Sequence, residues 1–309
     1  MNARNDTWTA GATALPRAAA PSTPTRRQAP RQSGAGERLW RIAVWSVMIF
    51  FLVNVGLMIA TVAMNSVATR WFGTPWPAGL TLDWYARAWS DFQLAHVLWV
   101  TFEVVGAVVL LSVVLGVPAA YALARAAFPG KRLVLLVFLL PLMVPPVTYG
   151  IPMATVLYQF GLGGTLAGVI LANLVPSLPF VILVMTPFIE QIDPNLESAA
   201  RIFGANTARY FRHVLLPLLV PGILAAALLV LVRTIGMFEL TFFTAGPDTQ
   251  TLVVALYYAV FSTGVRASQS IDAMAMIYMV ITLFWVLIAL RFVSPTQLVS
   301  RVKEAPRGE

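Results

Sequence analysis

Residue types that commonly do chemistry are scarce in this sequence. The chain has no cysteine, which excludes disulfides, thiol catalysis and cysteine-ligated metals. Its two histidines, His96 and His213, lie far apart and offer no metal-ligand spacing. No G-x-x-x-x-G-K-[ST] phosphate-binding loop occurs anywhere in the 309 residues. The sequence therefore predicts a chain that is not an enzyme, with no catalytic residue, no metal site and no cofactor of its own.

Three ionisable residues lie inside long apolar segments, where a charge is costly. Glu103 falls in the segment 98–124, and Arg233 and Glu239 fall in the segment 216–243. Such groups usually face a water-filled cavity or one another. Two carboxylates could receive the ammonium groups of a diamine. Alternatively, one of them pairs with Arg233 and only holds two helices together, and both interpretations stay open.

A second group of charged residues lies between two apolar segments, in the stretch 195–217. It contains Glu197, Arg201, Arg209, Arg212 and His213. Before it, Asp193 and Pro194 predict the start of a helix, because an oxygen-bearing cap and a proline in the first turn are both favoured there. Gly204 predicts the end of that helix. A second short helix, ended by Pro217, is expected to lead into the fifth apolar segment.

The first short helix carries an apolar face. Leu196, Ala199, Ala200 and Phe203 fall at i, i+3, i+4 and i+7. Two alanines on such a face allow another backbone to approach closely, whereas a helix lying on lipid headgroups would gain more from Leu or Trp. This spacing favours docking to another protein. An ordinary amphipathic connector between two membrane spans is the alternative.

The elements that must position these residues are membrane spans. With 59% hydrophobic residues and 11% charged residues, the composition is that of an integral membrane protein. Six apolar segments reach the roughly 20 residues needed to cross a bilayer: 41–64, 98–124, 133–157, 165–189, 216–243 and 271–293. Helices are expected, since a backbone in lipid must satisfy its own hydrogen bonds. The first segment is too long for a signal peptide, so an uncleaved anchor is expected.

Residues 1–38 are predicted to be a disordered basic tail, 39–295 the transmembrane domain and 296–309 a second tail. Lys and Arg concentrate in both tails and in the connections after the second and fourth spans. Because cytoplasmic segments carry the excess of Lys and Arg, both termini and the stretch 190–217 are predicted to be cytoplasmic. The net charge of +8 is explained in this way, and nucleic-acid binding is not expected.

The stretch 190–217 resembles the EAA loop of bacterial ABC importer permeases. In that family the pattern is E-A-A, three residues, G, nine residues and I-x-L-P. Here Ser198, Ala199 and Ala200 form the triplet, Gly204 follows after three residues, and the sequence VLLP ends at Pro217 nine residues later. Serine replaces the family's glutamate, with Glu197 just before it, and valine replaces isoleucine. Neither change disturbs the helix–glycine–helix pattern.

The resemblance implies an all-α, six-span permease of type I ABC importer architecture in the bacterial cytoplasmic (inner) membrane. It also implies partners: cytoplasmic ABC ATPase subunits that use ATP and Mg²⁺, a second permease subunit that is homologous or identical, and an external solute-binding protein. In the family this loop is the helix seated in a cleft of the ATPase. The ATPase-coupling residues carried over are Glu197, Ser198, Ala199, Ala200, Phe203, Gly204 and Pro217.

Three further stretches, 80–91, 139–153 and 238–252, resemble the polyamine branch of the family, so a polyamine or related cationic amine is the expected solute. The expected solute pathway contains Glu103, Tyr149, Arg233 and Glu239. Permeases for opines, aminophosphonates and iron share these stretches, and sugar permeases commonly show I-D-G-A where this chain has RIFGA. An ion-gradient secondary transporter remains an alternative function, although no internal repeat is evident. A membrane-embedded enzyme would need a catalytic constellation that the chain does not offer.

Overall fold

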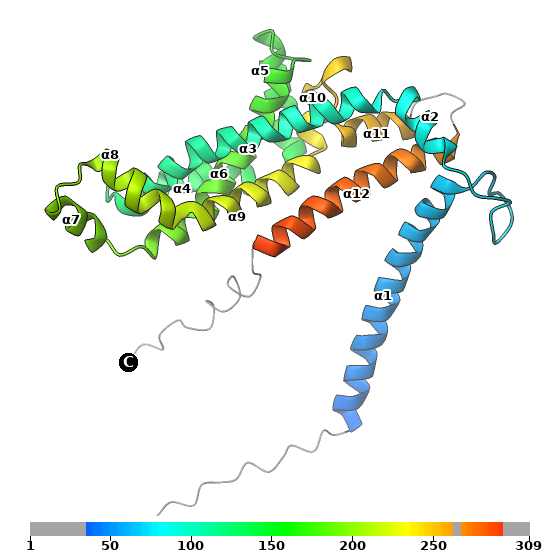
Figure 1. Cartoon of the computed structure of the whole chain (residues 1–309), viewed down its shortest axis with the longest axis horizontal. Helices are drawn as coiled ribbons and strands as arrows, with labels where there is room; N and C mark the ends of the chain where they lie inside the picture. The colour runs from blue at the N-terminus through cyan, green and yellow to red at the C-terminus, as the bar shows by residue number, and fades with distance from the viewer. Residues whose placement is uncertain (1–34, 262–266, 293–309) are drawn as a thin grey trace, which may run out of the picture. The chain divides into compact units, whose positions relative to one another are not determined.

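The computed structural model describes residues 35–261 and 267–292, and these residues are almost entirely helical (Figure 1). No strand forms within these two ranges, where pairing is limited to two isolated bridges. Contacts divide the chain into two units between Val55 and Gly56, inside the first helix, α1 (Ala35–Val67). Of the predicted tail 1–38, residues 1–34 lie outside the described residues, and residues 35–38 are helical. The predicted tail 296–309 also lies outside them.

Within the described ranges, five single helices are long and apolar enough to cross a bilayer. They are α1, α3 (Leu94–Arg125), α6 (Leu166–Glu190), α9 (Leu216–Ile235) and α12 (Ser268–Phe292). The third predicted span is a bent pair, α4 (Lys131–Met143) and α5 (Pro146–Gln159), whose axes differ by 100°. The predicted all-helical fold is therefore confirmed, with five apolar spans, or six when the bent pair is counted as one.

The bend in the third span follows from its prolines. Val144 and Pro145 have extended backbones, with ψ angles of 134°. A residue that precedes proline is disfavoured in the helical region, so two consecutive prolines at 145 and 146 end α4 and restart the chain as α5. These prolines therefore interrupt the third span and turn α5 away from the direction of α4.

The fifth span begins and ends earlier in the chain than predicted, since the apolar helix covers Ala208–Ile235. The segment 216–243 was expected to be one helix, but α9 ends at Ile235 and a separate helix, α10 (Glu239–Thr244), follows. Gly236, the poorest helix former after proline, occupies the break. Tertiary hydrogen bonds then hold α10 in place, because Asn173 donates to Thr241 Oγ1 at 3.1 Å and the Gly164 amide donates to the Thr244 carbonyl at 2.9 Å.

The buried core lies between α3, α6 and α9, which pack along one another. At the α3–α6 contact, a Cβ atom added to Gly116 would lie only 2.8 Å from Val181 Cγ1. The missing side chain therefore allows the two helices to approach closely, as small residues do between membrane helices. Fully buried valines such as Val104 and Val108 fill the same interface along α3.

The two ends of this bundle carry different short elements (Figure 1). One end has α7 (Asn195–Ile202), α8 (Thr207–Tyr210) and the π-helical turn η1 (Phe211–Leu215). The other has α2 (Asp83–Asp91), the 3₁₀ turn η2 (Pro247–Thr249) and α11 (Leu252–Phe261). There, Asn65 donates a hydrogen bond of 2.6 Å to Asp272, which joins the end of α1 to the first turns of α12.

Candidate functional site

The predicted helix–glycine–helix pattern is present at the end of the bundle that carries α7. The Asp193 carboxylate accepts a hydrogen bond of 2.9 Å from the amide of Asn195, the first residue of α7. Gly204 has a φ angle of +79°, in the left-handed region that favours glycine. Its amide donates to the Arg201 carbonyl at 2.9 Å, and the Ala205 amide donates to the Ala200 carbonyl at 3.0 Å. These bonds satisfy carbonyls at the end of the helix.

The second helix differs from the prediction at Pro217. The Asn206 side chain caps it, accepting a hydrogen bond of 2.9 Å from the Arg209 amide. The helix does not end at Pro217, however, because residues 208–235 run on as one apolar helix. Inside the π-helical turn η1, the Leu216 amide bonds to the Phe211 carbonyl, five residues back. This wider turn accommodates a proline that has no N–H to donate.

The apolar face predicted for the first helix is divided in the structure. Ala200 is half-buried and packs against the core cluster. Phe203 is 89% exposed, while Leu196 is 40% exposed. Phe203 is the capping residue that follows the last residue of α7, and it lies in the exposed turn before Gly204. The sequence interpretation missed Ile202, which is 84% exposed, although two consecutive apolar residues before a glycine could have indicated an exposed tip.

The remaining residues expected in this loop are exposed or outside the described part. Ser198 and Ala199 are exposed on α7. The side chain of Glu197 lies outside the described residues. Because Ile202 and Phe203 are large apolar side chains held at a loop tip, they form a surface that would gain free energy by contact with another protein. We refer to Ile202 and Phe203 as the tip pair.

Three of the four residues expected in the solute pathway come together. The Tyr149 hydroxyl on α5 is close enough to Arg233 and Glu239 to interact with both electrostatically. All three side chains are half-buried. Arg233 lies near the end of α9 and Glu239 begins α10, so the break in the fifth span places the two charges on separate elements. The Arg233 guanidinium lies 5.4 Å from the ring centre of Phe180, a cation–π distance.

The fourth residue, Glu103, is placed differently. It lies on α3, where its carboxylate accepts a hydrogen bond of 2.8 Å from the indole N–H of the exposed Trp99. Among the described residues, neither Glu103 nor Glu239 forms an ion pair with Arg233. No hydrogen bond joins Glu103 to Tyr149 in that part of the chain either. Tyr149 also packs against a buried cluster that contains Met237 and Leu240, which flank Glu239 in the chain. We therefore call Tyr149, Arg233 and Glu239 the Arg233 group.

An aromatic cluster adjoins the Arg233 group and was not foreseen from the sequence. Its rings come from α10, α11 and the residue before α10, with neighbouring ring centres 4.6 to 5.8 Å apart: Phe238, Phe242, Phe243, Tyr257, Tyr258 and Phe261. Glu239 shares its helix face with Phe242 and Phe243, at i+3 and i+4. The sequence signal was the density of rings in FELTFF and in the YY pair of α11. Aromatic faces beside a carboxylate suit a cation or the apolar face of a sugar ring.

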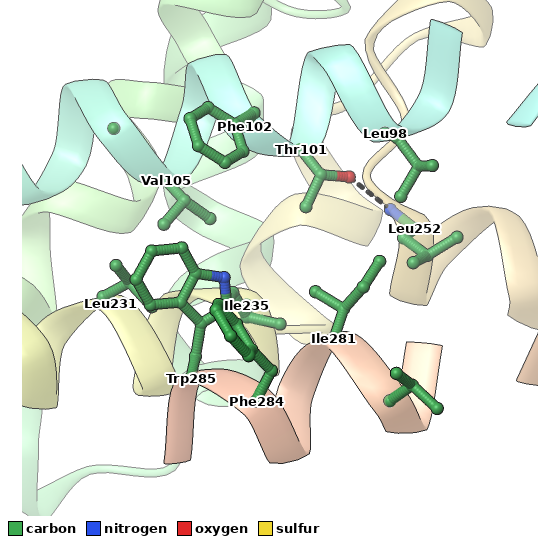
Figure 2. Close-up of a pocket in the computed structure, with 12 residues that line it drawn as sticks. Leu98, Thr101, Phe102, Val105, Leu231, Ile235, Leu252, Ile281, Phe284 and Trp285 are labelled. Atoms are coloured by element: carbon green, nitrogen blue, oxygen red, sulfur yellow. Dashed lines mark hydrogen bonds between the residues drawn. The ribbon is translucent and has the colours of Figure 1, made fainter. Parts of the chain in front are cut away.

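A separate apolar cavity of about 510 Å³ lies between α3, α9, α11 and α12 (Figure 2). Phe102, Val105, Leu231 and Trp285 are among the side chains that line it. Its threonine hydroxyl, on Thr101, already accepts a hydrogen bond of 2.8 Å from the Leu252 amide. None of the four residues expected in the pathway lines this cavity. Its lining offers little to a polar solute, and the Arg233 group remains the candidate for solute contact.

Comparison with known protein families identifies the class of protein. Residues 112–304, more than half of the chain, match the family of binding-protein-dependent transport system inner membrane components. This chain belongs to that family. The match includes the whole stretch 190–217, and the predicted membership of the ABC importer permeases is therefore confirmed. Its role as a membrane permease subunit, rather than an enzyme, agrees with the family.

Curated relatives transport different solutes. The trehalose transport system permease protein SugB of Mycobacterium tuberculosis is 32% identical over 62% of this chain and 72% of its own length. The molybdenum transport system permease protein ModB of Haemophilus influenzae is 37% identical over 50% and 75%. The spermidine/putrescine transport system permease protein PotB of the same organism is 29% identical over 63% and 73%. These relatives do not favour a polyamine over the other solutes.

A solved structure shares the fold. In a bacterial ABC transporter involved in the import of the acidic polysaccharide alginate, one chain superposes with a TM-score of 0.65. The superposition covers 83% of this chain and 97% of that chain, at 18% sequence identity. At this identity the likeness supports the permease fold and says nothing about the solute.

Proposed function

We propose that residues 190–217 are the contact through which a cytoplasmic ATPase drives this permease. The chain is a multi-pass membrane protein of the ABC importer family, and a family member without a phosphate-binding loop depends on a partner for ATP. The observation that carries the proposal is the tip pair, since Ile202 and Phe203 are 84% and 89% exposed at a glycine turn. Two large apolar side chains so placed in water are best explained by a partner that buries them.

The orientation and the partners follow from this contact. In the proposed assembly, α7 and both termini face the cytoplasm of a bacterial cell, a receptor delivers the solute outside, and a second permease subunit completes the pathway. Closure of the ATPase subunits would displace α7. Movement of a rigid element by a partner is an established way of coupling a binding site to a distant gate.

For the solute we propose a small organic cation, as the sequence suggests. Supporting this, Glu239 has no ion pair with Arg233 and stands beside aromatic rings, which attract cations. A specific observation also favours a second candidate, an oxyanion. Arg233 is a guanidinium inside the spans that forms no ion pair with a carboxylate of residues 35–261 or 267–292, and guanidinium is the side chain best suited to bind oxyanions.

The two candidates make opposite predictions at the Arg233 group. Receptor-dependent, ATP-driven uptake is measured in proteoliposomes for putrescine, molybdate and trehalose. If the solute is a cation, Glu239→Gln lowers uptake about tenfold, the effect expected from losing one charged contact, and Arg233→Gln leaves it less affected. If the solute is an oxyanion, the order is reversed. If only trehalose is taken up, and neither substitution changes its uptake, both the cation and the oxyanion proposals would be rejected.

The energy source of uptake tests the proposed ATP-driven transport directly. Uptake that stops on ATP depletion but continues with an uncoupler supports an ATP-driven importer. Uptake that survives ATP depletion and stops with the uncoupler would instead show an ion-gradient transporter.

A further inference from the structure

Helix α3 is the longest helix in the part of the chain after Gly56 that the structure describes. Its 32 residues correspond to about 48 Å at 1.5 Å per residue. It packs along α6 through the close contact at Gly116, and its buried valines contact the core throughout. A helix held in this way moves as a rigid body, because its backbone bonds are internal and a packed core resists continuous deformation.

At one end, α3 holds the entry to the coupling loop. Arg125 is its last residue, and the Arg125 guanidinium donates a hydrogen bond from Nη2 to the carbonyl oxygen of Ile192. Ile192 lies in the turn between α6 and α7, and its side chain packs against the core cluster. A cation beside carbonyls at a helix end is favourable, and a hydrogen bond from a charged donor is stronger than one from a neutral donor. Movement of α7 therefore pulls on the end of α3.

At its other end, α3 holds the connection between η2 and α11. Thr101 Oγ1 accepts the buried hydrogen bond from the Leu252 amide, drawn as a dashed line in Figure 2. One turn earlier, His96 Nε2 lies 3.0 Å from the carbonyl oxygen of Asp248. Asp248 is in η2 and Leu252 begins α11, so two side chains of α3 contact both ends of this connection. The same connection adjoins α10, which carries Glu239.

We propose that α3 transmits the movement of the coupling loop to the η2–α11 connection, and that Arg125 is the positioning residue that ties the loop to it. This inference rests on the proposed function of residues 190–217. It adds a route from the ATPase contact to the outer side of the Arg233 group. Arg125 touches neither solute nor nucleotide, and its role is to make α7 and α3 move together.

The first experiment measures solute transported per ATP hydrolysed, in proteoliposomes containing the permease, its ATPase and its receptor. Arg125→Ala is expected to lower this ratio about tenfold, within the range of measured coupling free energies, while the ATPase stays bound and hydrolyses ATP. Arg125→Lys keeps the positive charge and a hydrogen-bond donor, so it should transport more solute per ATP than Arg125→Ala and less than the unaltered chain. The control is Arg132→Ala, in the first turn of α4, because Arg132 is exposed and its side chain makes no hydrogen bond among the described residues.

The second experiment measures movement directly. The chain has no cysteine, so Ala122→Cys, at an exposed position of α3, and Ser198→Cys, on α7, place two spin labels without further changes. In the otherwise native complex, the distance between the labels should be the same without nucleotide and with trapped ATP. In the Arg125→Ala background, this distance should change between the two states, because α7 then moves without α3.

His96→Ala tests the other end of the route. It should lower the transport ratio with normal ATPase binding and with an unchanged distance between the labels. The proposal is overturned if Arg125→Ala keeps both the ratio and the constant distance, or if it loses the ATPase altogether, since Arg125 would then serve docking. If His96→Ala transports as much solute per ATP as the unaltered chain, the proposed contact between α3 and the η2–α11 connection would be overturned. Absence of ATP-driven uptake in the unaltered complex would instead refute the proposed function.

Discussion

Replacing Phe203 by alanine tests the coupling contact most directly. Because the Phe203 side chain is 89% exposed, its removal should leave the folded permease intact. In the complex, the ATPase is expected to bury this side chain. Full burial of a phenylalanine contributes about 1.5–3 kcal/mol, so Phe203→Ala should weaken ATPase binding by roughly 10- to 100-fold.

The assay is titration of purified ATPase onto the permease in lipid nanodiscs, with the dissociation constant as the readout. Phe72→Ala is the matched control. Phe72 is 95% exposed, but it lies in the connection between α1 and α2, at the other end of the described bundle. This control should bind the ATPase with unchanged affinity. Thermal unfolding of both variants in detergent should match that of the unaltered chain.

One result would refute the reasoning. If Phe203→Ala binds the ATPase within twofold of the unaltered chain, while its folding is normal, then the tip pair is not buried in the complex. The coupling contact would then have to lie elsewhere in residues 190–217. Equal losses in Phe203→Ala and Phe72→Ala would also contradict the model, because they would show a general effect of exposed rings on the preparation.

Three other predictions concern packing, the glycine turn and orientation. Gly116→Val should lower the free energy of unfolding by about 1–3 kcal/mol, because even a Cβ atom there would lie 2.8 Å from Val181. Chemical denaturation measures this change, and Gly106→Ala is the control because its Cβ atom would meet open space. In Gly204→Ala the new side chain meets no neighbouring atom, but the residue must adopt a φ angle of +79° at a cost of about 1–2 kcal/mol. The affinity of the permease for the ATPase should therefore fall roughly fivefold or more, while membrane insertion stays normal. Ser198→Cys should react with an impermeant maleimide only when the cytoplasmic side is opened, and labelling of intact cells would reverse the proposed topology.

Much of the architecture could be predicted because it depends on local features. The apolar runs specify where helices cross the membrane, since a backbone in lipid has few alternatives to a helix. Pro145 and Pro146 specify the bend in the third span through their effect on the preceding residues. Gly204 specifies a left-handed turn that other residues adopt only with strain. Each of these features acts within a few residues of chain, so one sequence is enough to see it.

The candidate sites were predicted less completely, because they depend on which elements meet. Phe203 followed the same helical repeat as Ala200, yet only Ala200 reaches the core. Glu103 and Glu239 were expected to share a pathway, but no contact in the described chain brings them together. The sequence shows dense rings in FELTFF and in the YY pair, but only the structure shows that α10 and α11 bring these rings together beside Glu239.

The amino-acid sequence by itself determined that this protein is a bundle of membrane helices with a glycine-centred turn between the fourth and fifth spans. Those properties arise from side-chain hydropathy and backbone preference, which act along the chain. Only the tertiary structure decided that the fifth span breaks at Gly236, that Arg233 has no carboxylate partner among the described residues and that Arg125 holds the entry to the coupling loop. Contacts of this kind join residues far apart in sequence, and they form only when whole helices pack at particular heights and rotations.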